Sequence, residues 1–157
     1  MQHGVAQRRI RKEIKFKHIE ANEQLSNLNI ACIAQDSKGF LWVGTTDGLN
    51  RFDGYEFKTY RSIENDSTSL VKNSIQTLFE DSRGTLWTST INSGLHYYDR
   101  AADAFHRIPK FSQRHCQVFC ITEDKNHNLW IGGSIDAHAF VATLDRLGIF
   151  EWVVKFV

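Results

Sequence analysis

The sequence predicts an all-β fold: β-propeller blades, each a four-stranded antiparallel meander, arranged as an incomplete propeller. Three observations carry this prediction. One segment returns 45 and then 43 residues later, and an aspartate marks each copy: Asp36, Asp81 and Asp124. A tryptophan follows six residues after each aspartate, at Trp42, Trp87 and Trp130. Turn residues recur at fixed offsets, and a repeat period in the low forties is typical of propeller blades.

The first strand of each copy is a short apolar run directly before the aspartate. These runs span residues 30–35, 75–80 and 118–123 and are rich in β-branched residues. We expect them to be inner strands buried on both faces. Cys32 and Cys120 occupy one repeat position, where Thr77 stands in the middle copy, which favours small core residues over thiol chemistry. With Cys116 the cysteines number three, and they have no disulfide-framework spacing.

Each aspartate then opens a tight turn. Its carboxylate can accept backbone N–H groups, and Gly39 or Gly84 can take a positive φ. In the third copy His127 replaces the glycine, and histidine tolerates that conformation better than most residues. The sequence therefore predicts the same turn three times.

The second strand carries Leu-Trp, and we expect each tryptophan to pack between neighbouring blades. Third strands follow at 49–52 and 95–98, and outer strands at 57–60 and 105–108. The predicted division of the chain is a basic, disordered segment at 1–15, blade 1 at 16–61, blade 2 at 62–108, and blade 3 with a divergent tail at 109–157.

The third copy departs from the pattern after Gly133. It has no Gly-Leu pair and no aromatic-Asp ending, and residues 137–157 finish in an apolar run. Two interpretations are open: a strand that pairs with residues 14–19, or a sequence unrelated to the repeat. The second is favoured. Three blades would leave two exposed sheet edges, which predicts self-association or pairing with other propeller blades.

Composition and charge exclude several classes of protein. The formal net charge is +1 and the basic residues are scattered beyond the N-terminal segment, so neither nucleic acid nor an anionic membrane is an expected partner. No apolar run approaches the ~20 residues of a membrane span. Arg8 and Arg9 are not followed by the apolar region of a signal peptide, so the chain as written would stay in the cytoplasm.

Three chemical constellations have simpler explanations. A blade period places the three anchor aspartates far apart, so turn formation explains them better than calcium binding. His115, Cys116, Cys120 and His127 match no common zinc spacing. Ser93, His96 and Asp99 resemble a catalytic triad in composition alone. We therefore expect no metal, no cofactor and no catalytic residue.

Polar and aromatic residues at the later turns and on the third strands are the candidate ligand-binding residues. Planar polar groups beside aromatic rings suit sugar hydroxyls and the apolar faces of sugars. The alternative is that several of them are solvated strand positions. The candidates are Asp47, Asn50, Arg51, Tyr55, Asn92, His96 and Tyr97.

The pattern Asp-x-x-Gly-x-Leu-Trp-x-Gly-Thr-x-x-Gly-Leu, followed by an aromatic residue and Asp, resembles the two-component regulator propeller repeat, over roughly residues 16–134. Residues 25–60 resemble the first blade of the sensor region of hybrid two-component regulators of Bacteroidetes. The resemblance implies a periplasmic propeller that reports glycan fragments to a histidine kinase.

The leading hypothesis is accordingly a non-catalytic sensor module that binds an oligosaccharide, within a phosphorelay system. One alternative is a propeller enzyme, such as a polysaccharide lyase, a hydrolase or a streptogramin-type lyase. The other is a protein-interaction scaffold that self-associates to complete its propeller.

Overall fold

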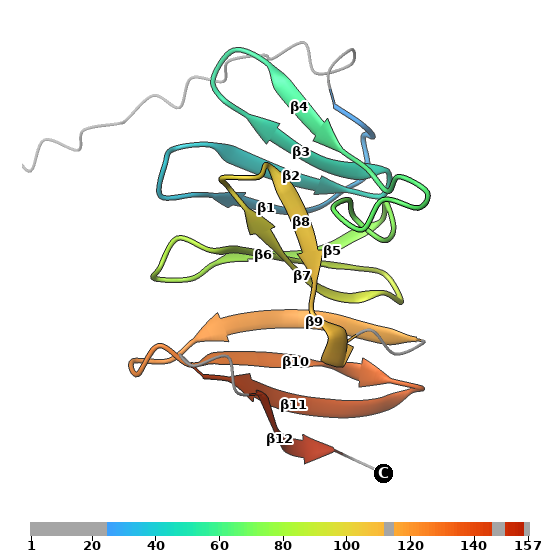
Figure 1. Ribbon diagram of the computed structural model, residues 1–157, viewed down its shortest axis with the longest axis vertical. Coiled ribbons are helices and arrows are strands. Elements are labelled where there is room, and N and C mark those ends of the chain that lie inside the picture. Colours follow the sequence, from blue (N-terminus) through green and yellow to red (C-terminus); the bar gives the residue numbers. More distant parts are fainter. Residues whose placement is uncertain (1–24, 112–114, 146–149, 156–157) are drawn as a thin grey trace, which may run out of the picture.

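The described part of the chain forms three four-stranded antiparallel sheets, which lie one above another (Figure 1). This computed structural model describes residues 25–111, 115–145 and 150–155. The sheet orders are β1-β2-β3-β4, β5-β6-β7-β8 and β12-β11-β10-β9, each a simple meander. We call these sheets blade 1, blade 2 and blade 3. The predicted all-β fold and its meander topology are confirmed, and the three sheets do not close into a ring.

The strands follow the repeat. Blade 1 comprises β1 (Ile30–Gln35), β2 (Leu41–Thr45), β3 (Gly48–Phe52) and β4 (Phe57–Tyr60). Blade 2 comprises β5 (Ile75–Glu80), β6 (Leu86–Thr90), β7 (Gly94–Asp99) and β8 (Ala104–Arg107). Blade 3 comprises β9 (Cys116–Glu123), β10 (Leu129–Ile135), β11 (His138–Leu144) and β12 (Phe150–Lys155). The 3-10 turn η2 (Pro109–Phe111) connects blades 2 and 3. The inner strand β5 contacts β1 on one side and β9 on the other.

Each anchor aspartate organises its turn and its tryptophan together. Oδ1 of Asp36 accepts the N–H groups of Lys38 and Phe40, while Oδ2 accepts the indole N–H of Trp42 at 2.8 Å. The equivalent indole bonds are 2.9 Å from Trp87 to Asp81 and 3.0 Å from Trp130 to Asp124. The predicted turn role is confirmed in all three blades. The indole hydrogen bond was not predicted from the sequence, although the constant spacing of six residues between the aspartate and the tryptophan indicates it.

The turns have the predicted backbone conformation. Gly39, Gly84 and His127 all lie at positive φ, at 89°, 81° and 65°. The substitution of glycine by His127 therefore leaves the turn geometry unchanged.

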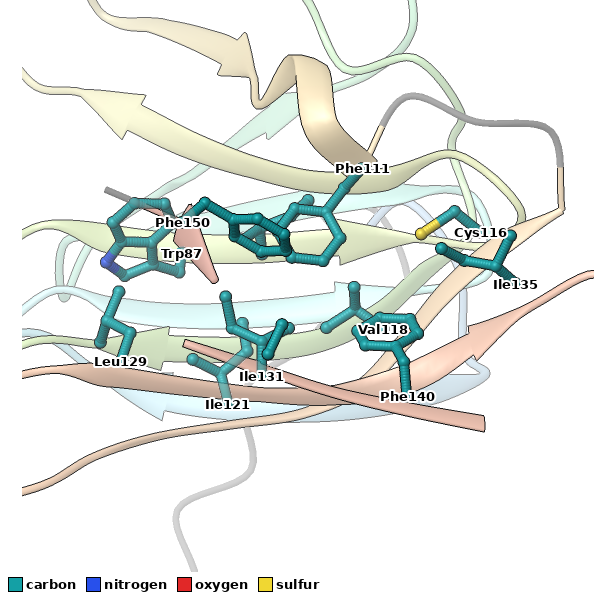
Figure 2. Packing of buried hydrophobic residues seen from close by; sticks show 12 residues of the cluster. Trp87, Phe111, Cys116, Val118, Ile121, Leu129, Ile131, Ile135, Phe140 and Phe150 are labelled. Atoms are coloured by element: carbon teal, nitrogen blue, oxygen red, sulfur yellow. The ribbon is translucent and has the colours of Figure 1, made fainter. Parts of the chain in front are cut away.

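Two apolar clusters join the blades. The first contains Trp42 and Leu49 of blade 1 with Ile75, Tyr98 and Phe105 of blade 2. The second joins blade 2 to blade 3, and in Figure 2 Trp87, Phe150 and Leu129 lie together at one end of it, with Cys116 and Ile135 at the other. The exposed fractions of the tryptophans are 0% for Trp42, 7% for Trp87 and 36% for Trp130. The prediction that each tryptophan packs between blades is confirmed for two. Trp130 is partly exposed because no fourth sheet covers it among the described residues.

The prediction that the inner strands are buried on both faces is wrong for blades 1 and 3. Ile30 and Ile33 of β1 are 56% and 62% exposed and Phe119 of β9 is 51% exposed, whereas Ile75 of β5 is buried. One side of β1 faces β5, and no described sheet covers its other side. Burial on both faces requires a blade on each side.

The favoured interpretation of residues 137–157 is also wrong. Leu144 pairs with Leu129, as Tyr98 pairs with Leu86 in blade 2, and Phe150 then pairs with Leu144. β11 and β12 therefore complete a regular four-stranded blade. The glycine-free turn at Asp136-Ala137, with φ values of 49° and 66°, replaces the Gly-Leu signal.

Several predictions concern residues that the structure does not describe. The disordered segment at 1–15 and the strand at 14–19 lie outside the described residues, and the division at residues 61 and 108 stays a prediction. Among the described residues, no helix has the length and hydropathy needed to cross a membrane.

Candidate functional site

The seven predicted ligand-binding residues do not form one site. Asp47 and Asn92 lie in equivalent turns between the second and third strands of blades 1 and 2. Tyr55 is 91% exposed in the turn between β3 and β4, at the opposite end of blade 1. Asn50 and His96 are buried at one repeat position, with Val43 and Thr88 as their cross-strand partners. The remaining two, Arg51 and Tyr97, lie at the seams between blades.

Asp47 holds the long connector between blades 1 and 2 in place. Its Oδ2 accepts a hydrogen bond from Arg61 at 3.1 Å, and its Oδ1 accepts one from the Asn73 amide at 3.0 Å. Arg61 also donates Nε–H to the backbone carbonyl of Asp47 at 3.0 Å. The two ends of the connector, residues 61–74, are thus fixed to one turn of blade 1.

The connector has an internally bonded structure. Oδ1 of Asn73 accepts the N–H of Ser62 at 2.7 Å, and the Ser69 hydroxyl accepts the N–H of Ile63 at 2.9 Å. Oδ1 of Asp66 accepts both the N–H and the hydroxyl of Thr68, at 2.8 and 2.6 Å. These hydrogen bonds lower the pKa of Asp66 below its ordinary value. Long loops without secondary structure of their own are often functional, and this one is preorganised.

Two adjoining hollows lie along the connector. The larger has a volume of about 540 Å³, and connector residues line it together with Arg107 of β8. The smaller, of about 240 Å³, reaches the outer strands of both blades through Lys58, Tyr60 and Asp103. Both hollows are lined by the same four connector residues: Ile63, Asp66, Ser69 and Leu70. We call the two together the connector pocket. It combines aliphatic surface with carboxylate, amide and hydroxyl groups.

A polar network forms the wall of the smaller hollow. The hydroxyls of Tyr60 and Tyr98 donate to Oδ1 of Asp103 at 2.7 and 2.5 Å, and Lys58 forms an ion pair with the other carboxylate oxygen. Arg51 donates to the Tyr98 hydroxyl at 2.8 Å. Partial burial alone would raise the pKa of Asp103, but hydrogen bonds from Lys58 and the two tyrosines lower it to about 2. Asp103 is therefore a carboxylate at neutral pH, and it links blade 1 to blade 2.

Arg51 and Tyr97 have different surroundings. The Arg51 guanidinium lies over the rings of Phe40 and Trp42, 4.9 and 5.8 Å from their centroids. Tyr97 packs beside Trp87 at the seam with blade 3, next to a hollow of about 370 Å³. Neither residue lines the connector pocket.

The buried position shared by Asn50 and His96 differs between the blades. In blade 1, the Ser26 hydroxyl bonds to Thr45 and accepts from the Asn50 amide, both at 2.8 Å. Val71 stands four residues before Ile75, as Ser26 stands four before Ile30. In blade 2 neither ring nitrogen of His96 nor the Thr90 hydroxyl makes a hydrogen bond to another described residue. Burial, with a contribution from Arg107, lowers the pKa of His96 to about 4, so its imidazole is neutral at pH 7.

The triad-like set of Ser93, His96 and Asp99 is not assembled. His96 is fully buried and makes no hydrogen bond to either partner, while Oδ1 of Asp99 accepts the N–H groups of Ala101 and Ala102 in the β7–β8 turn. Among the described residues, no three His, Cys, Asp or Glu side chains are arranged to bind a metal.

All three cysteines are unpaired, and burial raises the pKa values of the Cys32 and Cys116 thiols to about 11. A thiol with a raised pKa is a poor nucleophile at neutral pH. Cys120 is exposed, so the prediction of a small core residue is wrong at this position.

Comparison with known proteins agrees with this architecture. The family described as two component regulator propeller matches residues 24–47, 69–92 and 112–134, one match per blade. Histidine kinase P4 from Formosa agariphila is 51% identical over 55 residues, which are 35% of this chain and 4% of the kinase.

Solved structures share the fold. The extracellular domain of the hybrid two component system BT3049 from B. thetaiotaomicron has a TM-score of 0.70 and 28% identity, over 86% of this chain and 19% of that domain. Virginiamycin B lyase from Staphylococcus aureus has a TM-score of 0.58 at 16% identity, over 82% of this chain and 42% of the lyase, which is a likeness of fold alone. The chain thus spans a small part of the sensor proteins it resembles. Its three matched repeats and its shared fold show that this chain is built from repeats of the two component regulator propeller family.

Proposed function

We propose that this chain is a ligand-binding, non-catalytic segment of the extracytoplasmic sensor propeller of a hybrid two-component regulator, and that its ligand is an oligosaccharide held in the connector pocket. The observation that carries the proposal is a preformed pocket beside the seam of two blades, in a chain similar to the extracellular domain of a hybrid two-component system.

The chemistry of the pocket suits a sugar. Its larger hollow falls within the ~300–1,000 Å³ of typical ligand sites. Ile63 and Leu70 offer aliphatic surface to the apolar face of a sugar ring, and Asp66 and Ser69 offer hydrogen-bonding groups to its hydroxyls. Because the connector is already bonded internally, little ordering opposes binding.

The location of the pocket suits a sensor. Its walls come from the connector, from β4 of blade 1 and from β8 of blade 2. A ligand that touches the connector, β4 and β8 would bind more tightly to one relative position of the two blades than to others. Signalling requires such a difference in affinity between conformations. The whole protein would carry this change towards its kinase.

Binding is tested by titrating the chain with a panel of oligosaccharides, with saturation-transfer NMR to detect contact and calorimetry to measure affinity. Asp66→Asn removes the charge but keeps an oxygen for the turn at Thr68. We expect about tenfold weaker binding, the effect of losing one charge-assisted hydrogen bond.

Asp53→Asn is the matched control. Asp53 also uses Oδ1 to accept two backbone N–H groups, those of Tyr55 and Glu56 at 2.8 Å each, but it lies away from the pocket. Equal effects of the two substitutions would count against the pocket. Release of unsaturated or newly reducing sugar products would contradict a non-catalytic role.

A further inference from the structure

The seam between blades 2 and 3 contains a hollow of about 370 Å³, which we call the seam pocket. Side chains of blade 2, of η2 and of blade 3 line it together. They are Thr85, Trp87, Tyr97, Ile108, Lys110, Leu144 and Phe150. None of them lines the connector pocket, so the two pockets are separate.

The equivalent space at the seam between blades 1 and 2 is filled by aromatic rings of the protein itself. Trp42 stacks on Tyr60, with 5.6 Å between the ring centroids, and meets Tyr98 edge-on at 5.0 Å. The Phe40 ring packs against the same apolar cluster, and the Arg51 guanidinium lies 4.9 Å from its centroid. Three rings and one cation therefore gather around the tryptophan of blade 1.

Smaller side chains stand at the three equivalent positions around the tryptophan of blade 2. The positions are the turn residue four after the anchor aspartate, the residue that continues the outer strand, and the third-strand residue of the following blade. The counterparts of Phe40, Tyr60 and Tyr98 are Thr85, Ile108 and Leu144. All three counterparts line the seam pocket, so the hollow lies where the other seam carries aromatic rings.

The walls of the seam pocket suit an aromatic ring. Trp87 and Phe150 belong to one buried cluster, and the Tyr97 ring lies 6.0 Å from that of Trp87 between centroids. The indole N–H of Trp87 is already donated to Asp81, so this residue offers the apolar surface of its ring. Aromatic pairs gain stability beyond the area they bury. An apolar cavity of ~150 Å³ holds a benzene molecule, so the seam pocket has room for a ring with a short substituent.

A cation lies at the rim of the seam pocket. The Lys110 ammonium is 5.4 Å from the centroid of the Phe150 ring. Lys110 is exposed, and no described carboxylate forms an ion pair with it. Only two other lining side chains, Thr85 and Tyr97, carry polar groups. A sugar would leave most of its hydroxyls against apolar walls, whereas a ligand with one anionic group would meet a single cation.

We propose that the seam pocket binds a small aromatic carboxylic acid. Its ring takes the place that the Phe40 ring fills at the other seam, and its carboxylate pairs with Lys110. The ligand contacts both blade 2 and blade 3, so it stabilises one relative position of these blades. Binding here requires no ligand in the connector pocket.

Calorimetric titration of the whole chain with 3-phenylpropionate is the test, with the NMR signal of the Trp87 indole N–H as the reporter of location. We expect saturable binding that shifts this signal. 3-Cyclohexylpropionate has the same charge without an aromatic ring, and it should bind several-fold more weakly. D-Glucuronate places the carboxylate on a sugar ring, and it should bind at least about tenfold more weakly.

Two substitutions fill the seam pocket with the rings of the other seam. Thr85→Phe supplies the ring of Phe40 and should weaken binding at least about tenfold. Leu144→Tyr supplies the ring of Tyr98 and should have the same effect, so the test does not depend on the folding of one variant. Asn128→Phe is the matched control, because it adds a ring at the same turn position of blade 3, away from the seam pocket, and should keep the wild-type affinity.

The role of the cation is tested separately. Lys110→Gln should weaken binding of 3-phenylpropionate about threefold, the effect expected for an exposed ion pair. Lys125→Gln, at an exposed turn position of blade 3, should leave the affinity unchanged. The proposal is overturned if 3-phenylpropionate does not shift the Trp87 signal, if D-glucuronate binds more tightly than it does, or if both pocket-filling variants bind as the wild type does.

Discussion

Replacement of the buried His96 by Asn, the residue at the same repeat position in blade 1, should remove a specific part of the pH dependence of stability. The pKa of His96 is about 4 in the folded protein and 6.5 in its ordinary state, which we take for the unfolded chain. Between these values the unfolded chain binds a proton that the folded chain does not. Stability is therefore unaffected by His96 above pH 6.5 and is lost as the pH falls towards 4. The loss amounts to roughly 3 kcal/mol, at about 1.4 kcal/mol for each unit of pKa.

The assay is urea unfolding at a series of pH values across that window. The wild-type free energy of unfolding should fall by up to about 3 kcal/mol, and His96→Asn should flatten the curve whatever its stability at pH 7. His138→Asn, at an exposed hairpin position, is the control and should keep the wild-type slope. A flat wild-type curve, or an unchanged slope in His96→Asn, would refute the assignment of a buried neutral imidazole.

Three further predictions use the repeats as internal controls. Val71→Ser combined with His96→Asn rebuilds the Ser26–Thr45–Asn50 arrangement of blade 1, and the double-mutant cycle should show favourable coupling of about 1 kcal/mol; additive effects would contradict the equivalence of the two sites. Asp81→Asn should lower the free energy of unfolding, measured by chemical denaturation, by about 2 kcal/mol, because an amide N–H group would then face the Trp87 indole N–H. The same substitution should lower it much less in a Trp87→Phe background. Gly94→Ala would place Cβ 1.9 Å from the Phe111 carbonyl oxygen at a φ of 76°. We therefore expect its melting temperature to be far below that of Gly54→Ala, where the space around the new Cβ is open. Similar melting temperatures of the two variants would contradict this packing.

The repeated positions allowed most of the fold to be predicted from the sequence. The anchor aspartates and tryptophans mark a turn and a strand whose local hydrogen bonds depend on near neighbours, such as Asp36 and Trp42. These contacts are the same in all three copies. Position in the stack, by contrast, is not a local property. Ile33 and Leu78 occupy equivalent sites, but among the described sheets only Leu78 faces a neighbouring blade.

The last two strands of blade 3 were not predicted because the turn between β10 and β11 contains no glycine. Asp136 and Ala137 take positive φ without glycine, so the expected Gly-Leu pair is absent. Asp145 nevertheless follows β11 as Asp99 ends β7. An apolar residue followed by Asp, at Leu144-Asp145, was the signal that could have located the last hairpin.

The candidate site was less predictable than the fold. Adjacent strand residues point to opposite faces, so Asn50 is buried while Arg51 reaches the aromatic rings of the next seam. The connector pocket depends on Arg107, which lies far along the chain from residues 62–71. The 14 residues between β4 and β5 were the available signal, since so long a connection between blades is unusual.

The stacking of blades through a tryptophan seam is tested most directly by nuclear Overhauser effects from the Trp42 indole. Its ring centroid lies 5.0 Å from that of Tyr98 and 6.5 Å from that of Phe105, both in blade 2. The structure predicts strong cross-peaks to Tyr98 and weaker ones to Phe105. A well-dispersed spectrum of the folded chain that lacks both sets would contradict the stacked-blade arrangement.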